Sequence, residues 1–160
     1  MQGLSWALFS GGGLPRVRDF AGLTCDALVA REFWLGDRRV CRACYVFLSL
    51  GDGTAVGWWF DDDPEVWRTE PVDVVAVPGT DEGWVAEDGT RWRYPHVDLA
   101  SQLGITGRPL SRWVAVEAGS VPEVRLEFAD GATVVFTYDC RAESDWVQVA
   151  MQPGTPNEAL

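Results

Sequence analysis

The dipeptide Asp-Gly occurs three times in this chain, each time between two runs of strand-forming residues. The three copies are Asp52-Gly53, Asp88-Gly89 and Asp130-Gly131. Asp and Gly both tolerate the positive backbone φ angles that tight β-hairpin turns require. The sequence therefore predicts a mainly β fold with an α+β minority: an antiparallel curved sheet or small barrel built from hairpins, with one or two short helices.

The hairpin within VRLEFADGATVVF has the best-defined register. A three-residue loop over 129–131 pairs Leu126 with Val134 and Val124 with Phe136. This register gathers the apolar side chains on one face of the hairpin. The opposite face, which we expect to contact water, carries Glu123, Arg125 and Glu127.

The other two hairpins differ in character. The stretch YVFLSLGDGTAVGWWF is apolar at odd and even positions alike, which favours central strands covered on both faces. The stretch WVAEDGTRWRY places Trp84 near Trp92 across the strands. Further strands are predicted over 27–35, 112–117 and 146–150.

Helical signals are few. The run Asp63-Pro64-Glu65 combines an N-cap residue, a proline at the first helical position and an acidic first turn. It predicts a short helix that ends before Pro71. A second short helix is predicted over 97–103, ended by Gly104.

The 160 residues suit a single domain over 1–160. A Gly-rich segment over 10–15 and a tail over 152–160 are predicted to be flexible. No run of about 18 apolar residues predicts a transmembrane helix. The N-terminus lacks the basic region of a signal peptide. We therefore expect a cytoplasmic protein that makes no membrane contact.

The charge of the chain restricts its partners. It has 13 basic and 24 acidic residues, a formal charge of −11, and every basic residue is Arg. Without lysine, it can use neither a Schiff-base lysine nor a P-loop lysine. Its negative field repels nucleic-acid phosphates and attracts basic protein surfaces. The charge thus favours a basic protein partner and disfavours direct nucleic-acid binding.

The stretch WWFDDDPEVW is the candidate binding site, because it places carboxylates between aromatic residues. Tryptophan is enriched at interface centres, and aromatic groups beside carboxylates suit the capture of an Arg- or Lys-rich surface. The predicted partner-binding residues are Trp58, Trp59, Asp61, Asp62, Asp63, Glu65 and Trp67. The alternative interpretation is structural: a solvated turn and a helix cap, with Trp67 packed on the sheet.

The cysteines give a second candidate site. Cys41 and Cys44 have the C-x2-C spacing of a zinc site or redox pair, and Cys25 and Cys140 would complete four zinc ligands. A zinc-stabilised structural module is therefore one alternative. However, residues three apart in a strand point to opposite faces, and isolated cysteines in a reducing cytosol are usually buried hydrophobic residues. The favoured prediction contains no metal and no cofactor.

His96 is the single histidine, and Asp98 follows it closely. A small enzyme or small-ligand binder with a carboxylate-lined pocket near His96 is the second hypothesis. The chain has none of the common catalytic motifs, so no catalytic residue is assigned. The tryptophans also suggest a carbohydrate-binding surface, for which Trp84 and Trp92 are the candidate platform.

The C-terminal stretch VRLEFADGATVVFTYDCRAESDW is similar to the last hairpin of small, uncharacterised proteins of actinobacterial type. The residues that carry the resemblance are Leu126, Phe128, Asp130, Gly131, Asp139, Glu143 and Trp146. The match departs from the pattern at Ser144-Asp145, where an extra residue precedes the Trp. Such proteins often accompany toxin genes and are regarded as immunity proteins. The leading hypothesis is therefore a non-enzymatic bacterial immunity or inhibitor protein that occludes a basic partner, such as a toxin or a nucleic-acid-handling enzyme.

Overall fold

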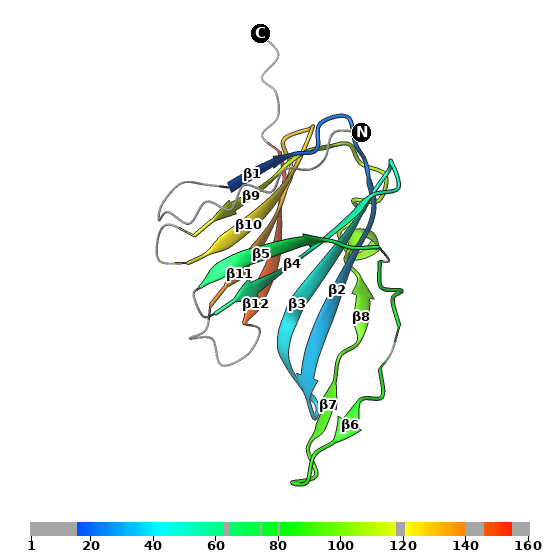
Figure 1. Cartoon of the computed structure of the whole chain (residues 1–160), viewed down its shortest axis with the longest axis vertical. Helices are drawn as coiled ribbons and strands as arrows, with labels where there is room; N and C mark the ends of the chain where they lie inside the picture. Colours follow the sequence, from blue (N-terminus) through cyan, green and yellow to red (C-terminus); the bar gives the residue numbers. More distant parts are fainter. Residues whose placement is uncertain are drawn as a thin grey trace.

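The structure is a computed structural model that describes residues 16–62, 65–73, 75–79, 81–117, 121–139 and 146–154. Its strands form two antiparallel sheets that share one hydrophobic core (Figure 1). The predicted mainly β fold with antiparallel strands is thus confirmed. Of the two expected forms, open sheets are found, because hydrogen bonding among the described residues closes neither sheet into a barrel.

The smaller sheet has five strands in the order β1-β9-β10-β11-β12. Their bounds are β1 (Arg16–Asp19), β9 (Leu110–Val116), β10 (Glu123–Phe128), β11 (Thr133–Tyr138) and β12 (Val147–Gln152). The register of β10 and β11 pairs Leu126 with Val134 and Val124 with Phe136. This is the predicted register, and the bond from the Phe128 amide to the Ala132 carbonyl, 2.9 Å long, closes the predicted loop.

The larger sheet follows the order β5-β4-β3-β2-β7-β6, with β8 paired to β2. Its strands are β2 (Cys25–Leu35), β3 (Arg38–Leu50), β4 (Ala55–Asp61), β5 (Val66–Pro71), β6 (Trp84–Val85), β7 (Arg91–Arg93) and β8 (His96–Asp98). β3 lies between β2 and β4, as the apolar pattern of the first hairpin predicts. The β6–β7 hairpin extends beyond the tip of β2 and β3 at one end of the molecule (Figure 1).

The core lies between the facing sides of the two sheets. From the larger sheet, Leu28, Leu48 and Trp58 are fully buried. From the smaller sheet, Leu126 and Phe136 are fully buried as well. Burial of large apolar side chains from both sheets supplies the main driving force for their association.

A polar contact also joins the two sheets near β1. The guanidinium of Arg16 in β1 forms an ion pair with Glu117, directly after β9, and donates to the backbone carbonyl of Trp67 in β5. The Glu117 carboxylate accepts a further hydrogen bond, 3.1 Å long, from the Trp67 amide. These contacts fix the edge strand of the larger sheet to the smaller sheet.

The helices only partly follow the prediction. α1 (Leu99–Leu103) has Asp98 as its N-cap and Gly104 as a left-handed C-cap, so the predicted helix and its end are confirmed, while the first two residues of the predicted range belong to β8. The helix predicted after Asp63 is wrong, because 66–71 form β5 and pair with β4. A short isolated helix gains little stability, whereas the paired strand gains a ladder of hydrogen bonds and buries Trp67.

Of the two segments predicted to be flexible, the structure describes part of one only. The segment over 10–15 lies outside the described residues. The predicted tail overlaps the end of β12 at Gln152, and Gly154 lies against Asp130 and Gly131. Residues 155–160 lie outside the described part. Within the described part, no helix is long and apolar enough to cross a membrane.

Candidate functional site

The predicted partner-binding stretch is divided between the core and the surface. Trp58 and Trp67 have no exposed surface, so the expectation that their indoles meet a partner is wrong. The ring of Trp58 makes edge contacts with Trp113 and Phe136 of the other sheet, at centroid distances of 6.3 and 5.5 Å. Alternation along β4 turns Trp58 into the core and therefore turns Trp59 to the outer face.

The remaining predicted residues that the structure describes lie outside the core. Trp59 is half-buried and stacks on Tyr45, with ring centroids 5.5 Å apart. Asp61 pairs with Arg68 on the neighbouring strand, at 2.6 Å. Asp62 and Glu65 are exposed in the β4–β5 turn, and Asp63 lies outside the described residues. The stretch thus forms a hairpin in which two of the three indoles are buried in the core, and only Trp59 lies on the same outer face as Asp61.

The exposed indole of the larger sheet lies elsewhere, on the β6–β7 hairpin. We call residues 81–94 the finger. Trp84 is 53% exposed, and the neighbouring Val85 is also exposed. Trp84 pairs with Trp92 across the hairpin, as predicted, and the two rings stack at 5.2 Å. Because the rings stack on each other, they do not form the flat two-ring platform that the carbohydrate hypothesis requires.

Packing at its base holds the finger in place. β7 pairs with the end of β2, and the Trp92 ring lies 5.3 Å from Phe33. Phe33 in turn stacks on Tyr94 at 5.0 Å. Gly83 also matters, because a Cβ there would lie 1.7 Å from the Trp92 carbonyl oxygen. The exposed Trp84 is therefore presented from an aromatic base rather than from an unsupported loop.

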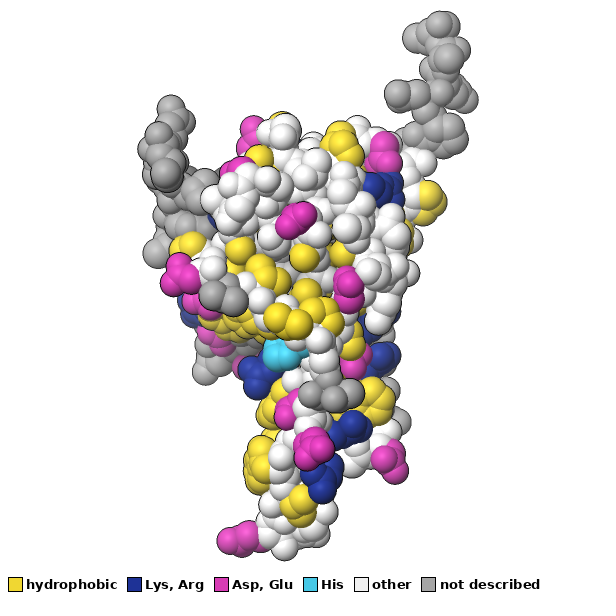
Figure 2. Space-filling model, turned by 90° about the vertical axis from the view of Figure 1, so that its right-hand side faces the viewer, with side chains coloured by type: hydrophobic (Ala, Val, Ile, Leu, Met, Phe, Trp, Pro, Cys, Tyr) yellow, Lys and Arg dark blue, Asp and Glu magenta, His cyan; other side chains and the backbone are white. Residues whose placement is uncertain are grey.

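The finger exposes carboxylates, whereas its arginines are engaged in contacts within the chain. Arg91 donates to the Glu82 carbonyl at 2.7 Å. Arg93 donates to the Gly36 carbonyl and lies over the Trp34 ring. Glu82 and Glu87 are exposed, and their carboxylates have no hydrogen bond or ion pair with the described residues. Figure 2 shows the finger as the narrow lower projection, with hydrophobic, basic and acidic side chains on its surface.

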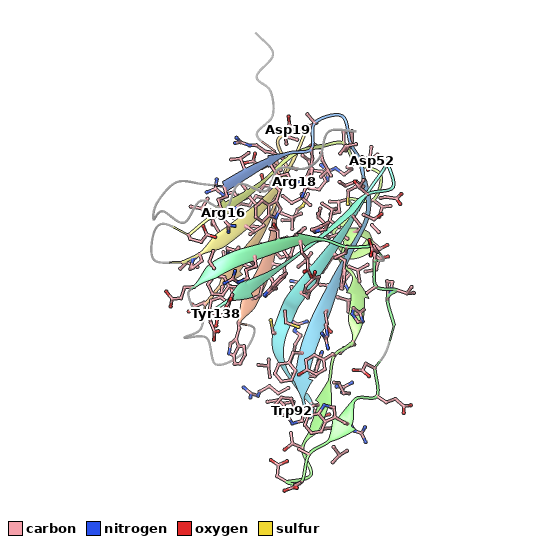
Figure 3. All side chains as sticks on the ribbon, in the orientation of Figure 1. Arg16, Arg18, Asp19, Asp52, Trp92 and Tyr138 are labelled. Atoms are coloured by element: carbon pink, nitrogen blue, oxygen red, sulfur yellow. The ribbon has the colours of Figure 1, made fainter. Side chains whose placement is uncertain are left out.

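The finger lies at one end of the larger sheet. Trp92 is at the opposite end of the molecule from Asp52, in the β3–β4 turn (Figure 3). The carboxylate of Asp52 is engaged locally, since it accepts bonds from the amide and hydroxyl of Thr54. The finger is therefore the end of the sheet at which an exposed indole and unpaired carboxylates occur together.

The cysteines do not assemble into the predicted four-ligand zinc site. Cys25 begins β2, and Cys41 pairs with Phe33, which is eight residues along the same strand. At about 3.3 Å per residue this separation is roughly 26 Å, too far for one metal ion to bind both cysteines. Cys140 lies outside the described residues, among which no group of three His, Cys, Asp or Glu could hold a metal.

Cys41 and Cys44 lie together, although positions three apart in a regular strand would diverge. A register shift between Arg31 and Phe33 bends the ladder opposite this part of β3. A hydrogen bond between the two thiols, followed by burial, raises the pKa of Cys44. The Cys44 thiol also donates to the Arg31 carbonyl at 3.1 Å. The expectation of opposite faces is wrong here because the ladder is irregular.

His96 lies on the outer face of the larger sheet. It pairs with Arg31 in β2, and its ring is 6.0 Å from Phe47. Burial, followed by the charge of Arg31, lowers its pKa. Gly79 exchanges two backbone hydrogen bonds with His96, which holds the segment over 75–79 beside β8. Figure 2 shows hydrophobic side chains gathered directly above His96.

A pocket of about 340 Å³ opens between this segment, the sheet and α1. Its described lining consists of Asp26, Ala27, Val29, Ser49, Val75, Ala76, Val77, Pro78, Asp98, Ala100, Ser101 and Thr106. The carboxylates of Asp26 and Asp98 thus share one pocket, while His96 is absent from its described lining. Asp26 could not be found from sequence, because a chain segment fifty residues away completes the pocket.

Comparisons with protein-family models, curated proteins and solved structures found no match to this chain.

Proposed function

We propose that this chain is a non-enzymatic, acidic binding protein of the bacterial cytoplasm. In this proposal it acts as an immunity or inhibitor protein that occludes a basic protein partner, such as a toxin or a nucleic-acid-handling enzyme. The finger is its contact surface. The observation that carries the proposal is the exposed indole of Trp84, on a supported hairpin whose glutamates are unpaired within the described chain.

The apolar part of the finger suits the centre of an interface. Trp is the side chain most enriched among residues that dominate binding energy, and such residues are surrounded by contacts that exclude water. Trp84 and Val85 are exposed next to each other in β6. Because the base of the finger is packed on Phe33, little conformational entropy would be lost when a partner covers Trp84.

The charge of the chain would guide a basic partner toward the finger. A formal charge of −11 accelerates encounter with positive surfaces, and this effect weakens as salt increases. Glu82 and Glu87 would then pair with Arg or Lys of the partner at the rim of the contact. The similarity of the C-terminal hairpin to immunity-type proteins supports the same functional class.

The test is co-purification of the tagged chain from its native host at about 50 and 500 mM salt, a range over which ionic screening changes strongly. We expect recovery of a basic protein at low salt, loss of that protein from Trp84→Ala, and weaker recovery by a Glu82→Gln, Glu87→Gln double variant. Purified chain should also inhibit the activity of the recovered partner. Circular dichroism of each variant verifies that it remains folded.

Trp146→Ala is the matched control, because Trp146 is also exposed but lies directly before β12 of the other sheet. This variant should retain the partner. Failure to recover any salt-sensitive basic protein would contradict the functional class. A partner that Trp84→Ala and wild type bind equally well would contradict the finger as the contact surface.

A further inference from the structure

The pocket beside α1 has an apolar floor and an apolar wall. Its floor is the outer face of the larger sheet, where Ala27 pairs with Ser49 and Val29 pairs with Asp98. The segment over 75–78 forms a wall, and the Gly79–His96 bridge anchors that segment to β8. At about 340 Å³ the pocket falls within the range of small-ligand sites, roughly 300–1,000 Å³.

Two carboxylates give the pocket a negative charge. Asp26 lies in a register shift between Cys25 and Ala27, so it has no partner in the β2–β3 ladder. The carboxylate of Asp26 has no hydrogen bond or ion pair with any residue the structure describes. Asp98 ends β8 and caps α1 by accepting bonds from the amide and hydroxyl of Ser101.

The charges of Asp26 and Asp98 both affect the neighbouring Cys25 thiol. Burial, followed by the charges of Asp26 and then Asp98, raises the pKa of the nearby Cys25 thiol to about 12. Among the described residues that line the pocket, none is basic. The negative potential in the pocket is therefore not neutralised by its own described lining.

We propose that this pocket binds a primary ammonium or guanidinium group carried on an aliphatic stem. The cationic head would lie between Asp26 and Asp98, with the Ser49 hydroxyl as a further acceptor. The stem would pack against the apolar wall that Val75 and Val77 provide. Such a ligand satisfies the charge of the pocket and its apolar surface at the same time.

The cation could be free in solution or could be the side chain of a basic protein. Both sources share this chemistry, and the experiment separates them. The site does not depend on the finger, since it lies on the outer face of β2 and β3 and involves none of the residues over 81–94. Loss of the pocket proposal would therefore leave the proposed function of the finger intact, and the reverse is also true.

The experiment uses isothermal titration calorimetry and amide NMR on the full chain. The probes are 1,5-diaminopentane, agmatine and a capped peptide with one central Arg flanked by Gly and Ser. Pentan-1-ol, hexanoate and calcium chloride serve as neutral, anionic and metal controls. We expect saturable binding of at least one cationic probe, with amide shifts at Ser49, Asp98 and Ser101.

Two conservative variants test the carboxylates. Asp26→Asn and Asp98→Asn should each weaken binding about tenfold, the expected effect of losing one charge-assisted contact. Asn is also a good N-cap, so Asp98→Asn preserves the start of α1. Asp37→Asn is the matched control, because this exposed carboxylate lies in the β2–β3 turn and outside the described lining of the pocket. It should leave the affinity unchanged.

The probes distinguish the two sources of the cation. Binding of the diamine or agmatine supports a free ligand, whereas binding of the Arg peptide alone supports a side chain of a protein partner. The proposal is overturned if no cationic probe saturates, or if pentan-1-ol, hexanoate or calcium binds as well as the amines. It is also overturned if Asp37→Asn weakens binding as much as Asp26→Asn does, since that result would indicate attraction to overall charge only.

Discussion

The indole rings of Trp84 and Trp92 stack 5.2 Å apart across the β6–β7 hairpin, with an interplanar angle of 16°. One of the two, Trp84, remains 53% exposed, while Trp92 is half-buried against Phe33. The stack thus couples an exposed ring to the body of the larger sheet. A surface tryptophan held in this way contributes little to the core and is available to a partner.

Substitution of surface and core tryptophans should therefore have different effects on stability. Trp84→Ala should lower the free energy of unfolding by about 1 kcal/mol or less, because only one stacked aromatic contact is lost. Trp58→Ala should lower it by about 3–5 kcal/mol, because Trp58 is fully buried between Trp113 and Phe136. Urea denaturation followed by far-UV circular dichroism measures both values.

Equal losses for Trp84→Ala and Trp58→Ala would contradict this division between surface and core. The measurement also needs Trp146→Ala as a control for the removal of an exposed indole outside the finger, directly before β12. Its loss should be similar to that of Trp84→Ala. These three variants separate the contribution of burial from that of residue type.

Local pattern was sufficient to predict the β10–β11 hairpin. Its apolar residues alternate, so only one register places Val124, Leu126 and Phe128 on the buried face. The caps of α1 are also predictable from the sequence, because Asp98 and Gly104 each bond to residues within one helical turn. In both cases the information lies in residues that are close together in the chain.

Long-range contacts explain where the sequence was misleading. Alternation shows that Trp58 and Trp59 point to opposite faces, but it does not show which face meets the second sheet. The cap signals after Asp63 are local, and they are overridden by the pairing of β5 with β4. The pocket depends on the Gly79–His96 bridge, and no residue near either position in the sequence predicts that pairing.

The contact between Arg16 and Glu117 yields a second prediction. Glu117→Ala removes the acceptor of both the Arg16 guanidinium and the Trp67 amide. Leaving these donors unsatisfied at the junction of the sheets should lower the free energy of unfolding by about 1–3 kcal/mol. Glu117→Gln keeps an acceptor oxygen and should lose less. Chemical denaturation of both variants tests this order.

Glu127→Ala is the control for the loss of an ordinary surface ion pair. Glu127 pairs with Arg112 on the exposed side of the smaller sheet, where 51% of the Arg112 side chain is accessible. Such pairs contribute up to about 1 kcal/mol, so this variant should be the mildest of the three. A loss for Glu127→Ala that matched Glu117→Ala would show that the contact between the sheets has no special role.

The single histidine should make stability depend on pH in a narrow window. Burial and Arg31 lower the pKa of His96 in the folded state, and Asp81 opposes them. The unfolded chain therefore binds more protons as the pH falls through about 6.5, the pKa of a free histidine. The stabilising contribution of neutral His96 is present above this pH and is lost as the pH falls below it.

The free energy of unfolding of wild type and His96→Gln, measured between pH 8 and pH 5, tests this sign. Wild type should lose more stability than the variant over this interval. The carboxylates with lowered pKa values, such as Asp98, contribute in a separate window, because they lose their stabilising effect only as the pH falls below about 4. Parallel curves for the two proteins above pH 5 would contradict the assignment to His96.

The described cysteines should react slowly in the folded protein. Burial, together with the charges of Asp26 and Asp98, raises the pKa of Cys25 to about 12. The hydrogen bond to Cys41, followed by burial, raises the pKa of Cys44. At pH 8 a thiol with a pKa near 12 is only about 0.01% thiolate, against about a quarter for a free cysteine with a pKa near 8.5. Since the thiolate is the reactive form, labelling requires local or global unfolding.

The measurement uses Cys140→Ser, which removes the cysteine that lies outside the described residues. With a thiol reagent at pH 8, the folded variant should react at least about 100-fold more slowly than the same variant in guanidinium chloride, because both burial and thiolate fraction oppose the reaction. Adding Cys25→Ser should remove one labelled thiol per unfolded chain without changing the slow rate of the folded one. Rapid labelling of the folded Cys140→Ser protein would show that at least one of the thiols of Cys25, Cys41 and Cys44 is accessible, and would contradict the slow reaction expected of all three.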